Sequence, residues 1–143
     1  MTNFRGSTLN SILGRPWKAN AHGPDAFDCW HLVMFVQRAL FDRNLPDVDV
    51  PDRPTWPWMI KTIAGHDENA NWRLVPVDPM GLVQAKDGAI VLMARSNRPA
   101  HVGTWLEQER RIIHADPNYG VVTDGLLDLR TKGWVKLRFY EHV

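Results

Sequence analysis

The sequence predicts an α+β fold, with helices in the first half of the chain and an antiparallel sheet in the second. Two observations lead to this prediction. Apolar residues recur every three or four positions over residues 29–40, which is a helical period. After residue 72 the chain changes to short β-rich runs separated by Gly, Pro, Asn and Asp. Helices first and strands afterwards favour a long helix packed on one face of the sheet.

Composition excludes several classes of protein. The 143 residues fit a single domain spanning 1–143, and 44% hydrophobic with 23% charged residues is typical of globular proteins. A formal charge of +1 without long runs of one sign gives no indication of nucleic-acid binding. No run approaches the roughly 20 apolar residues of a membrane span. No signal peptide is recognisable, so we expect a cytoplasmic protein on synthesis.

The first half is expected to hold three helices. A short one covers residues 7–13 and ends at Gly14. The main helix runs to about residue 41, with Asp25 or Asp28 as its N-cap, which places Cys29 in or beside the first turn. Four prolines in residues 46–57 break the chain, and a short helix follows over residues 58–64.

The second half is expected to form about five strands. They cover residues 73–77, 89–94, 101–106, 111–115 and 134–140. If residues 107–110 form the loop between the third and fourth strands, Leu106 lies opposite Arg111. That even loop would project His101 and His114 from the same face of the sheet, whereas an odd loop would put them on opposite faces.

Cys29, His101 and His114 together could carry nucleophilic catalysis. A thiol at a helix N-terminus lies where exposed amides and the helix dipole favour an anion, so we expect a lowered pKa. A histidine on a neighbouring strand could take the thiol proton, and a second polar group could fix its tautomer. The amides of the first helical turn could bind an oxyanion.

Two other interpretations of these residues stay open. A free cysteine on the apolar stripe of a helix is usually a small core residue, and here it is the only cysteine of the chain. Its being alone excludes an intrachain disulfide and paired-cysteine zinc motifs. Cys29, His101 and His114 are also ligand types that zinc accepts, but the helix-start position of the thiol favours catalysis, and no metal is expected.

Several segments resemble, in order, the motifs of NlpC/P60 cysteine peptidases. That family has a Gly-x-Pro-Tyr element, a Phe-Asp-Cys-Ser-Gly-Leu motif that opens the long helix, Leu-Pro after it, and later Gly-Asp-Ile-Val and His-Val-Gly strands. The resemblance covers residues 13–143. The segments that carry it are Gly14-Arg15-Pro16-Trp17, Phe27-Asp28-Cys29, Leu45-Pro46, Asp87-Gly88-Ala89-Ile90-Val91, His101-Val102-Gly103 and Ile113-His114-Ala115.

The resemblance implies a papain-like NlpC/P60 fold and a cell-wall hydrolase. Its substrate would be the amide bonds of peptidoglycan stem peptides, of the γ-D-glutamyl-diaminopimelate type, cut without a cofactor. Cys29 would be the nucleophile, His101 the general base and then acid, and His114 the residue that orients it. Asp28 matches a position linked to recognising the amino end of the stem peptide, although capping the helix is an equally good physical role.

The sequence departs from the family beside the nucleophile. Trp30-His31 replaces Ser-Gly, and Trp17 replaces Tyr, so both tryptophans stand where substrate contacts are expected. An aromatic residue after the cysteine, with a short N-terminus, no signal peptide and no wall-binding domain, resembles the subgroup encoded with bacteriophage tail genes. That implies phage tail proteins as partners and a virion tail as the destination.

The same departures leave two alternatives of function open. One is a papain-like structural or binding module of a tail assembly that does not cut. The other is an amidase or acyl transferase that uses the same three residues on a different substrate, because a fold by itself does not fix the reaction.

Overall fold

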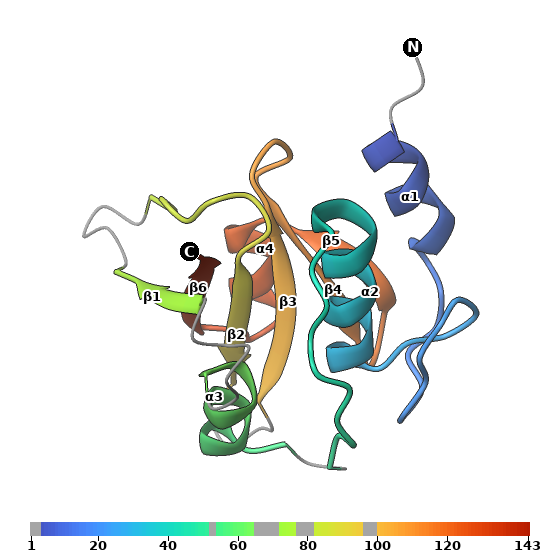
Figure 1. Cartoon of the computed structure of the whole chain (residues 1–143), viewed down its shortest axis with the longest axis horizontal. Helices are drawn as coiled ribbons and strands as arrows, with labels where there is room; N and C mark the ends of the chain where they lie inside the picture. Colours follow the sequence, from blue (N-terminus) through green and yellow to red (C-terminus); the bar gives the residue numbers. More distant parts are fainter. Residues whose placement is uncertain (1–3, 52–53, 65–71, 77–81, 96–99) are drawn as a thin grey trace.

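A computed structural model describes residues 4–51, 54–64, 72–76, 82–95 and 100–143. It confirms the α+β class, since helices come first and a fully antiparallel sheet of six strands follows (Figure 1). The sheet has the order β1-β6-β2-β3-β4-β5. Its strands are β1 Trp72–Val75, β2 Ile90–Ala94, β3 His101–Leu106, β4 Arg111–Asp116, β5 Gly120–Asp124 and β6 Lys136–His142.

Three of the four described helices were predicted. They are α1 (Phe4–Ile12), α2 (Cys29–Phe41) and α3 (Trp56–Ala64), each within a few residues of the predicted bounds. The fourth helix, α4 (Leu126–Thr131), and strand β5 before it were not predicted. Strand β5 contains only two apolar residues, Val121 and Val122, and the six residues of α4 make fewer than two helical turns, so neither carries a recognisable pattern.

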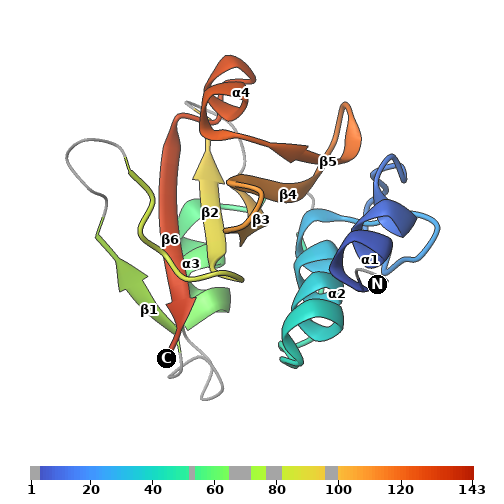
Figure 2. The ribbon, with the colours of Figure 1, turned by 90° about the horizontal axis from the view of Figure 1, so that it is seen from above.

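Apolar layers cover both faces of the sheet. In β2 the side chains of Ile90 and Leu92 join the core under α2 and α3, whereas Val91 and Met93 join the core under α4. Consecutive residues of a strand point to opposite faces, so α4 lies across the sheet from the other helices. Figure 2 shows α1 and α2 packed together beside β4 and β5, with α4 away from them. None of the described helices has the length and apolar character needed to cross a membrane.

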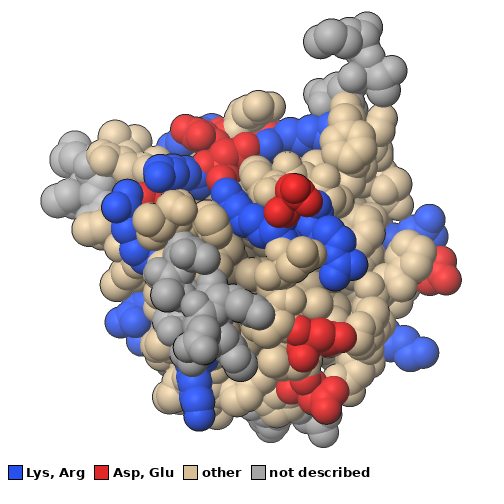
Figure 3. All heavy atoms as spheres, in the orientation of Figure 1, with Lys and Arg blue, Asp and Glu red and all other residues tan. Residues whose placement is uncertain are grey.

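Charged side chains are interspersed over the surface. The face drawn in Figure 3 carries basic and acidic groups side by side, as the near-neutral balance of the sequence requires. No element of the fold is therefore marked by a broad surface of one sign on that face.

The hairpin of β3 and β4 has the predicted register. Leu106 pairs with Arg111, which leaves residues 107–110 as the loop. In this register His101 and His114 lie diagonally across the two strands with their side chains on one face, so the predicted juxtaposition of the two histidines is confirmed.

Gly103 allows β3 and β4 to approach closely beside these histidines. A Cβ placed there would lie 2.7 Å from the carbonyl oxygen of Ile113, 2.8 Å from Cγ2 of Ile112 and 3.0 Å from Cβ of His114. All three atoms belong to buried residues of the neighbouring strand β4 and cannot move aside cheaply. The third residue of the His-Val-Gly segment is therefore required by packing.

We predict that Gly103→Ala lowers the free energy of unfolding by about 1–3 kcal/mol, because it overpacks a rigid interface. Urea denaturation followed by circular dichroism measures this change. The matched control is Gly125→Ser at the N-cap of α4, where the nearest atom to an added Cβ is 3.8 Å away and a serine suits the cap. Equal stability of Gly103→Ala and the wild type would contradict the packing argument.

Candidate active site

The nucleophile candidate stands at the first position of α2. Of the two predicted N-caps it is Asp28 that caps the helix, and its Oδ1 accepts a hydrogen bond of 2.7 Å from the amide of His31. Cys29 follows directly and is buried, with its side chain at the edge of the core between α2 and the sheet. The cap therefore fixes the sulfur at the helix start, as predicted.

The two histidines form a continuous hydrogen-bonded chain with an aspartate that the sequence analysis missed. His101 Nε2 and His114 Nδ1 are 2.9 Å apart, and His114 Nε2 lies 2.7 Å from Oδ2 of Asp124. Lys132 Nζ contacts both oxygens of the same carboxylate, at 2.8 and 3.1 Å. Asp124 ends β5, and because that strand was not predicted, nothing placed its carboxylate beside His114.

This chain defines the protons on both rings. An ionised carboxylate only accepts, so His114 must donate its Nε2–H to Asp124 and keep a lone pair on Nδ1. His101 then donates its Nε2–H to that lone pair, which leaves Nδ1 of His101 as the free base. Burial acts to raise the pKa of Asp124, but the hydrogen bonds from His114 and Lys132 outweigh it and hold the pKa below its usual value. The carboxylate therefore stays ionised and keeps both tautomers fixed.

Trp134 holds the His101 ring from one side. The two rings stack with centroids 4.7 Å apart and an interplanar angle of 20°. Trp134 is itself buried, so the imidazole has little freedom to rotate out of the chain. No local pattern indicates this contact, because Trp134 precedes β6 and His101 begins β3, far apart in the sequence.

A cleft of about 590 Å³ contains both Cys29 and His101. His114 lies behind His101, fully buried, and reaches the cleft only through it. Trp17 also lines the cleft and is 37% exposed, with its backbone held against Phe27 by an isolated β-bridge. The structure thus brings the predicted Cys29, His101, Asp28 and Trp17 to one cavity.

Trp30 does not line the cleft, so it is not placed to contact a substrate there. Its side chain is 0% exposed, belongs to the core under α2, and donates its indole N–H to the carbonyl of Pro46 at 3.0 Å. An enclosed ring cannot touch a ligand in the cleft, so the structure argues against the substrate contact expected of Trp30. It is a core residue that ties the helix start to the proline-rich connector.

His31 also points away from the cleft. Its Nδ1 lies 2.9 Å from both oxygens of Asp28, and its Nε2 lies 2.9 Å from Oδ1 of Asp47. The pKa of His31 is raised, because these two carboxylates outweigh the effect of burial, which alone would lower it. The Asp28 carboxylate that the resemblance linked to substrate is therefore occupied by the helix cap and by His31.

The thiol is not the stabilised anion that its helix position predicts. Burial, with a smaller contribution from the Asp28 carboxylate, raises the pKa of Cys29 to about 12, although the amides of Trp30, Cys29 and Val102 act in the opposite direction. Burial also lowers the pKa of His101 well below its ordinary value, and the positive charge of Arg95 acts in the same direction. Cys29 and His101 thus line the cleft as a neutral thiol and a neutral imidazole, which corrects the expectation of a thiolate.

Two sets of residues combine side chains that can bind a metal ion. In the proposed Cys29, His101 and His114 set, both ring nitrogens of His114 and one of His101 are already hydrogen-bonded within the chain to Asp124. Within the described ranges, the set whose ligand atoms lie within 4.8 Å of one another is His22, His31 and Asp47. Both nitrogens of His31 are engaged by carboxylates there, so we interpret it as an ion-paired cluster.

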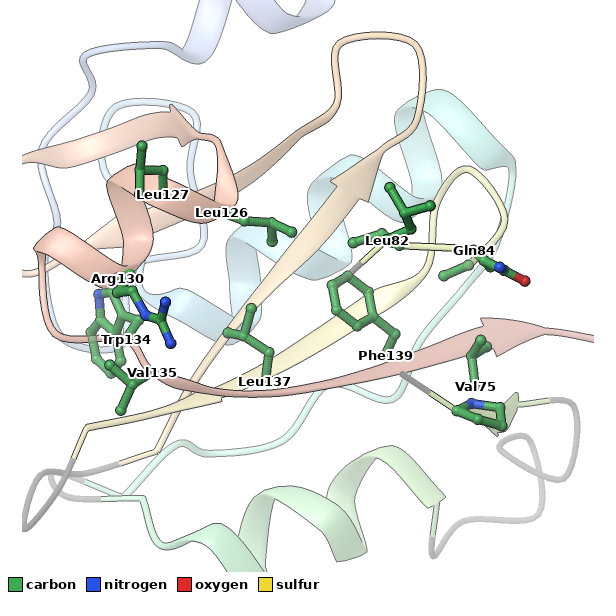
Figure 4. A pocket seen from close by; sticks show the side chains of 13 residues that line it. Val75, Leu82, Gln84, Leu126, Leu127, Arg130, Trp134, Val135, Leu137 and Phe139 are labelled. Atoms are coloured by element: carbon green, nitrogen blue, oxygen red, sulfur yellow. The ribbon is translucent and has the colours of Figure 1, made fainter. Parts of the chain in front are cut away.

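A second hollow, of about 480 Å³, lies on the α4 side of the sheet (Figure 4). Its lining is mainly apolar and includes Leu82, Leu126, Leu137 and Phe139. Trp134 lines this hollow as well as the cleft, so its ring lies between the two. The hollow contains none of the hydrogen-bonded histidines and offers no nucleophile among its described residues.

A buried cysteine at a helix start, packed on an antiparallel sheet that carries a histidine pair, defines a papain-like α+β protein. Among solved structures the chain is similar to NlpC/P60 domains, and its fold is theirs. No protein-family model matches the sequence, and no curated protein does.

Three solved structures illustrate this likeness. The NlpC/p60 domain of the peptidoglycan hydrolase SagA aligns with a TM-score of 0.57 and 18% identity, covering 99% of this chain and 100% of that one. NlpC2 from Trichomonas vaginalis gives 0.57 and 19%, and NlpC1 from the same organism 0.55 and 17%, each over 96% of this chain. The chain spans 45% and 42% of those two proteins.

We predict that iodoacetamide alkylates Cys29 more slowly than free cysteine near neutral pH, with a rate that rises steeply above about pH 9, since the thiolate is scarce when the pKa is high. Mass spectrometry of the labelled protein measures the rate. Asp28→Asn keeps an oxygen for the helix cap but removes the charge that raises the pKa, so it should label faster. Labelling of the wild type faster than free cysteine at neutral pH would overturn the neutral thiol and imidazole pair.

Proposed function

We propose that the protein is a cysteine peptidase that hydrolyses amide bonds in peptidoglycan stem peptides, of the γ-D-glutamyl-diaminopimelate type. One observation carries the proposal: Cys29 and His101 line one cleft, and His101 is held by a buried chain through His114 to Asp124. The fold adds support, because a structural neighbour is described as a peptidoglycan hydrolase. Assignment of the catalytic roles to Cys29, His101 and His114 is part of the proposal.

The first half of the reaction forms an acyl-enzyme. Sγ of Cys29 attacks the substrate carbonyl while its proton passes to the free Nδ1 of His101, so that the thiolate need not exist beforehand. The electron pair of the C=O bond moves onto oxygen, and the amide of Cys29 at the helix start is placed to donate to that oxyanion. When the intermediate collapses, the C–N bond breaks, and His101 gives the proton to the leaving amine.

The second half releases the product. Water attacks the thioester and loses a proton to Nδ1 of His101, and that proton returns to sulfur as the C–S bond breaks. His114 and Asp124 touch neither substrate nor water in this scheme. They are positioning residues, because they keep a proton on Nε2 of His101 and the lone pair on its Nδ1.

The main argument for a non-catalytic module does not agree with the structure. It depended on the large residues Trp30 and His31 in place of small ones, and neither lines the cleft. An amidase or acyl transferase that uses the same three residues is the second candidate function. Association with a phage tail likewise stays a proposal, supported by the aromatic residue after the cysteine and not by the structural neighbours.

We predict that Cys29→Ala abolishes the release of peptide fragments from purified peptidoglycan while the circular dichroism spectrum and thermal unfolding stay close to those of the wild type, because only the sulfur is removed. Mass spectrometry of the soluble fragments measures release. Undiminished release by this variant would contradict the mechanism. Absence of release by the wild type on walls of several peptide types would instead favour the non-catalytic module.

We also predict that Asp124→Asn lowers kcat on the order of 10⁴-fold with little change in KM. Lys132 competes for the one remaining oxygen, so the amide group turns its N–H toward His114 and reverses both tautomers, which puts a proton on Nδ1 of His101. The control is Asp128→Asn on the exposed side of α4, which should keep wild-type kinetics. A loss confined to KM, or no loss, would contradict the positioning role.

A further inference from the structure

The cleft contains one charge that no described residue neutralises. Two of its lining side chains are charged, Asp28 and Arg95. Asp28 is 2% exposed and is committed to His31 and the helix cap. Arg95 makes no ion pair and no side-chain hydrogen bond within the part of the chain that the structure describes, and its buried Nε has no acceptor there. The free charge of the cleft is therefore positive.

Arg95 is held in place by contacts that leave its charge unbalanced. It follows the last residue of β2, and its guanidinium lies over the Trp134 ring with Cζ 4.0 Å from the centroid. Gly133 provides the room, since a Cβ at that position would lie 3.3 Å from Nε of Arg95. Trp134 is also the ring stacked on His101, so one indole contacts both the cation and the proposed general base.

We propose that Arg95 binds a substrate carboxylate adjacent to the scissile amide, and that this carboxylate is the free α-carboxylate of a γ-glutamyl residue. A planar guanidinium fits a carboxylate better than any other common partner, and a stacked guanidinium keeps its N–H edges available while its face is covered. A partly buried cation without a counterion is costly, so a ligand that supplies the counterion gains that energy on binding. This inference rests on the proposed function and adds the substrate feature that the cleft selects.

The other cleft residues agree with this class of ligand. Asn20 and Asn118 offer amides, and the remaining contacts are mainly apolar or aromatic, such as Trp17 and Val50. Lys132 lies in the adjoining hollow but is committed to Asp124, so it does not compete for the anion. A carboxylate on Arg95 would also offset the repulsion that lowers the pKa of His101, and would make that ring a better proton acceptor once substrate is bound.

The test compares two peptides that differ in a single group. One has a γ-D-glutamyl residue with a free α-carboxylate before the scissile bond, and the other carries an α-carboxamide there. We expect the wild type to prefer the carboxylate by at least about tenfold in kcat/KM, equivalent to roughly 1.4 kcal/mol. Arg95→Gln should reduce the ratio to near one, Arg95→Lys should retain part of it, and the control Arg130→Gln on α4 should keep it.

A binding measurement separates this inference from the proposed function. In the Cys29→Ala background, calorimetry should show tighter binding of the carboxylate peptide than of the carboxamide, and Arg95→Gln should remove that difference. Loss of the difference together with a folded protein supports the inference even if the wild type cuts neither peptide. An unchanged preference in Arg95→Gln, in either measurement, overturns it and leaves the proposed hydrolysis standing if both peptides are cut.

Discussion

The pairing of β3 with β4 is the constraint on which the candidate site depends. The register that puts Leu106 opposite Arg111 also puts His101 diagonal to His114 on one face, with their nitrogens 2.9 Å apart. A slip by one residue would send one imidazole to the opposite face and break the chain to Asp124. Gly103 protects this register, because any larger residue would force the two strands apart at the histidines.

Burial sets the electrostatics of the site. In a medium of low polarity a lone charge is costly, so the charged groups around the cleft occur as compensated sets: Asp124 with His114 and Lys132, and Asp28 with His31. Cys29 and His101 have no such partner and remain neutral until a substrate arrives. Arg95 is the exception, and its unbalanced charge is what gives the cleft a preference for an anion.

Sequence patterns predicted the elements that are long or that carry strong local signals. Helix α2 was predicted from its apolar stripe and its capping aspartate, and the β3–β4 hairpin from two apolar runs around a four-residue loop. Strand β5 was missed because only two of its residues are apolar, and helix α4 because its six residues make fewer than two turns. Asp124 ends β5 and Lys132 follows α4, so the part of the hydrogen-bonded chain beyond His114 was not predicted either.

The sequence by itself determined that Cys29 lies at the start of a helix and that His101 and His114 share a face if the loop between their strands is even, because capping and strand alternation are local properties. The structure decided for the even loop. Only the tertiary structure decided the environment of these groups. It buried Trp30 in the core instead of the cleft, occupied Asp28 with His31, stacked Trp134 on His101 and raised the pKa of the thiol. Each of these depends on how segments distant in the sequence exclude water from one another, which no local pattern records.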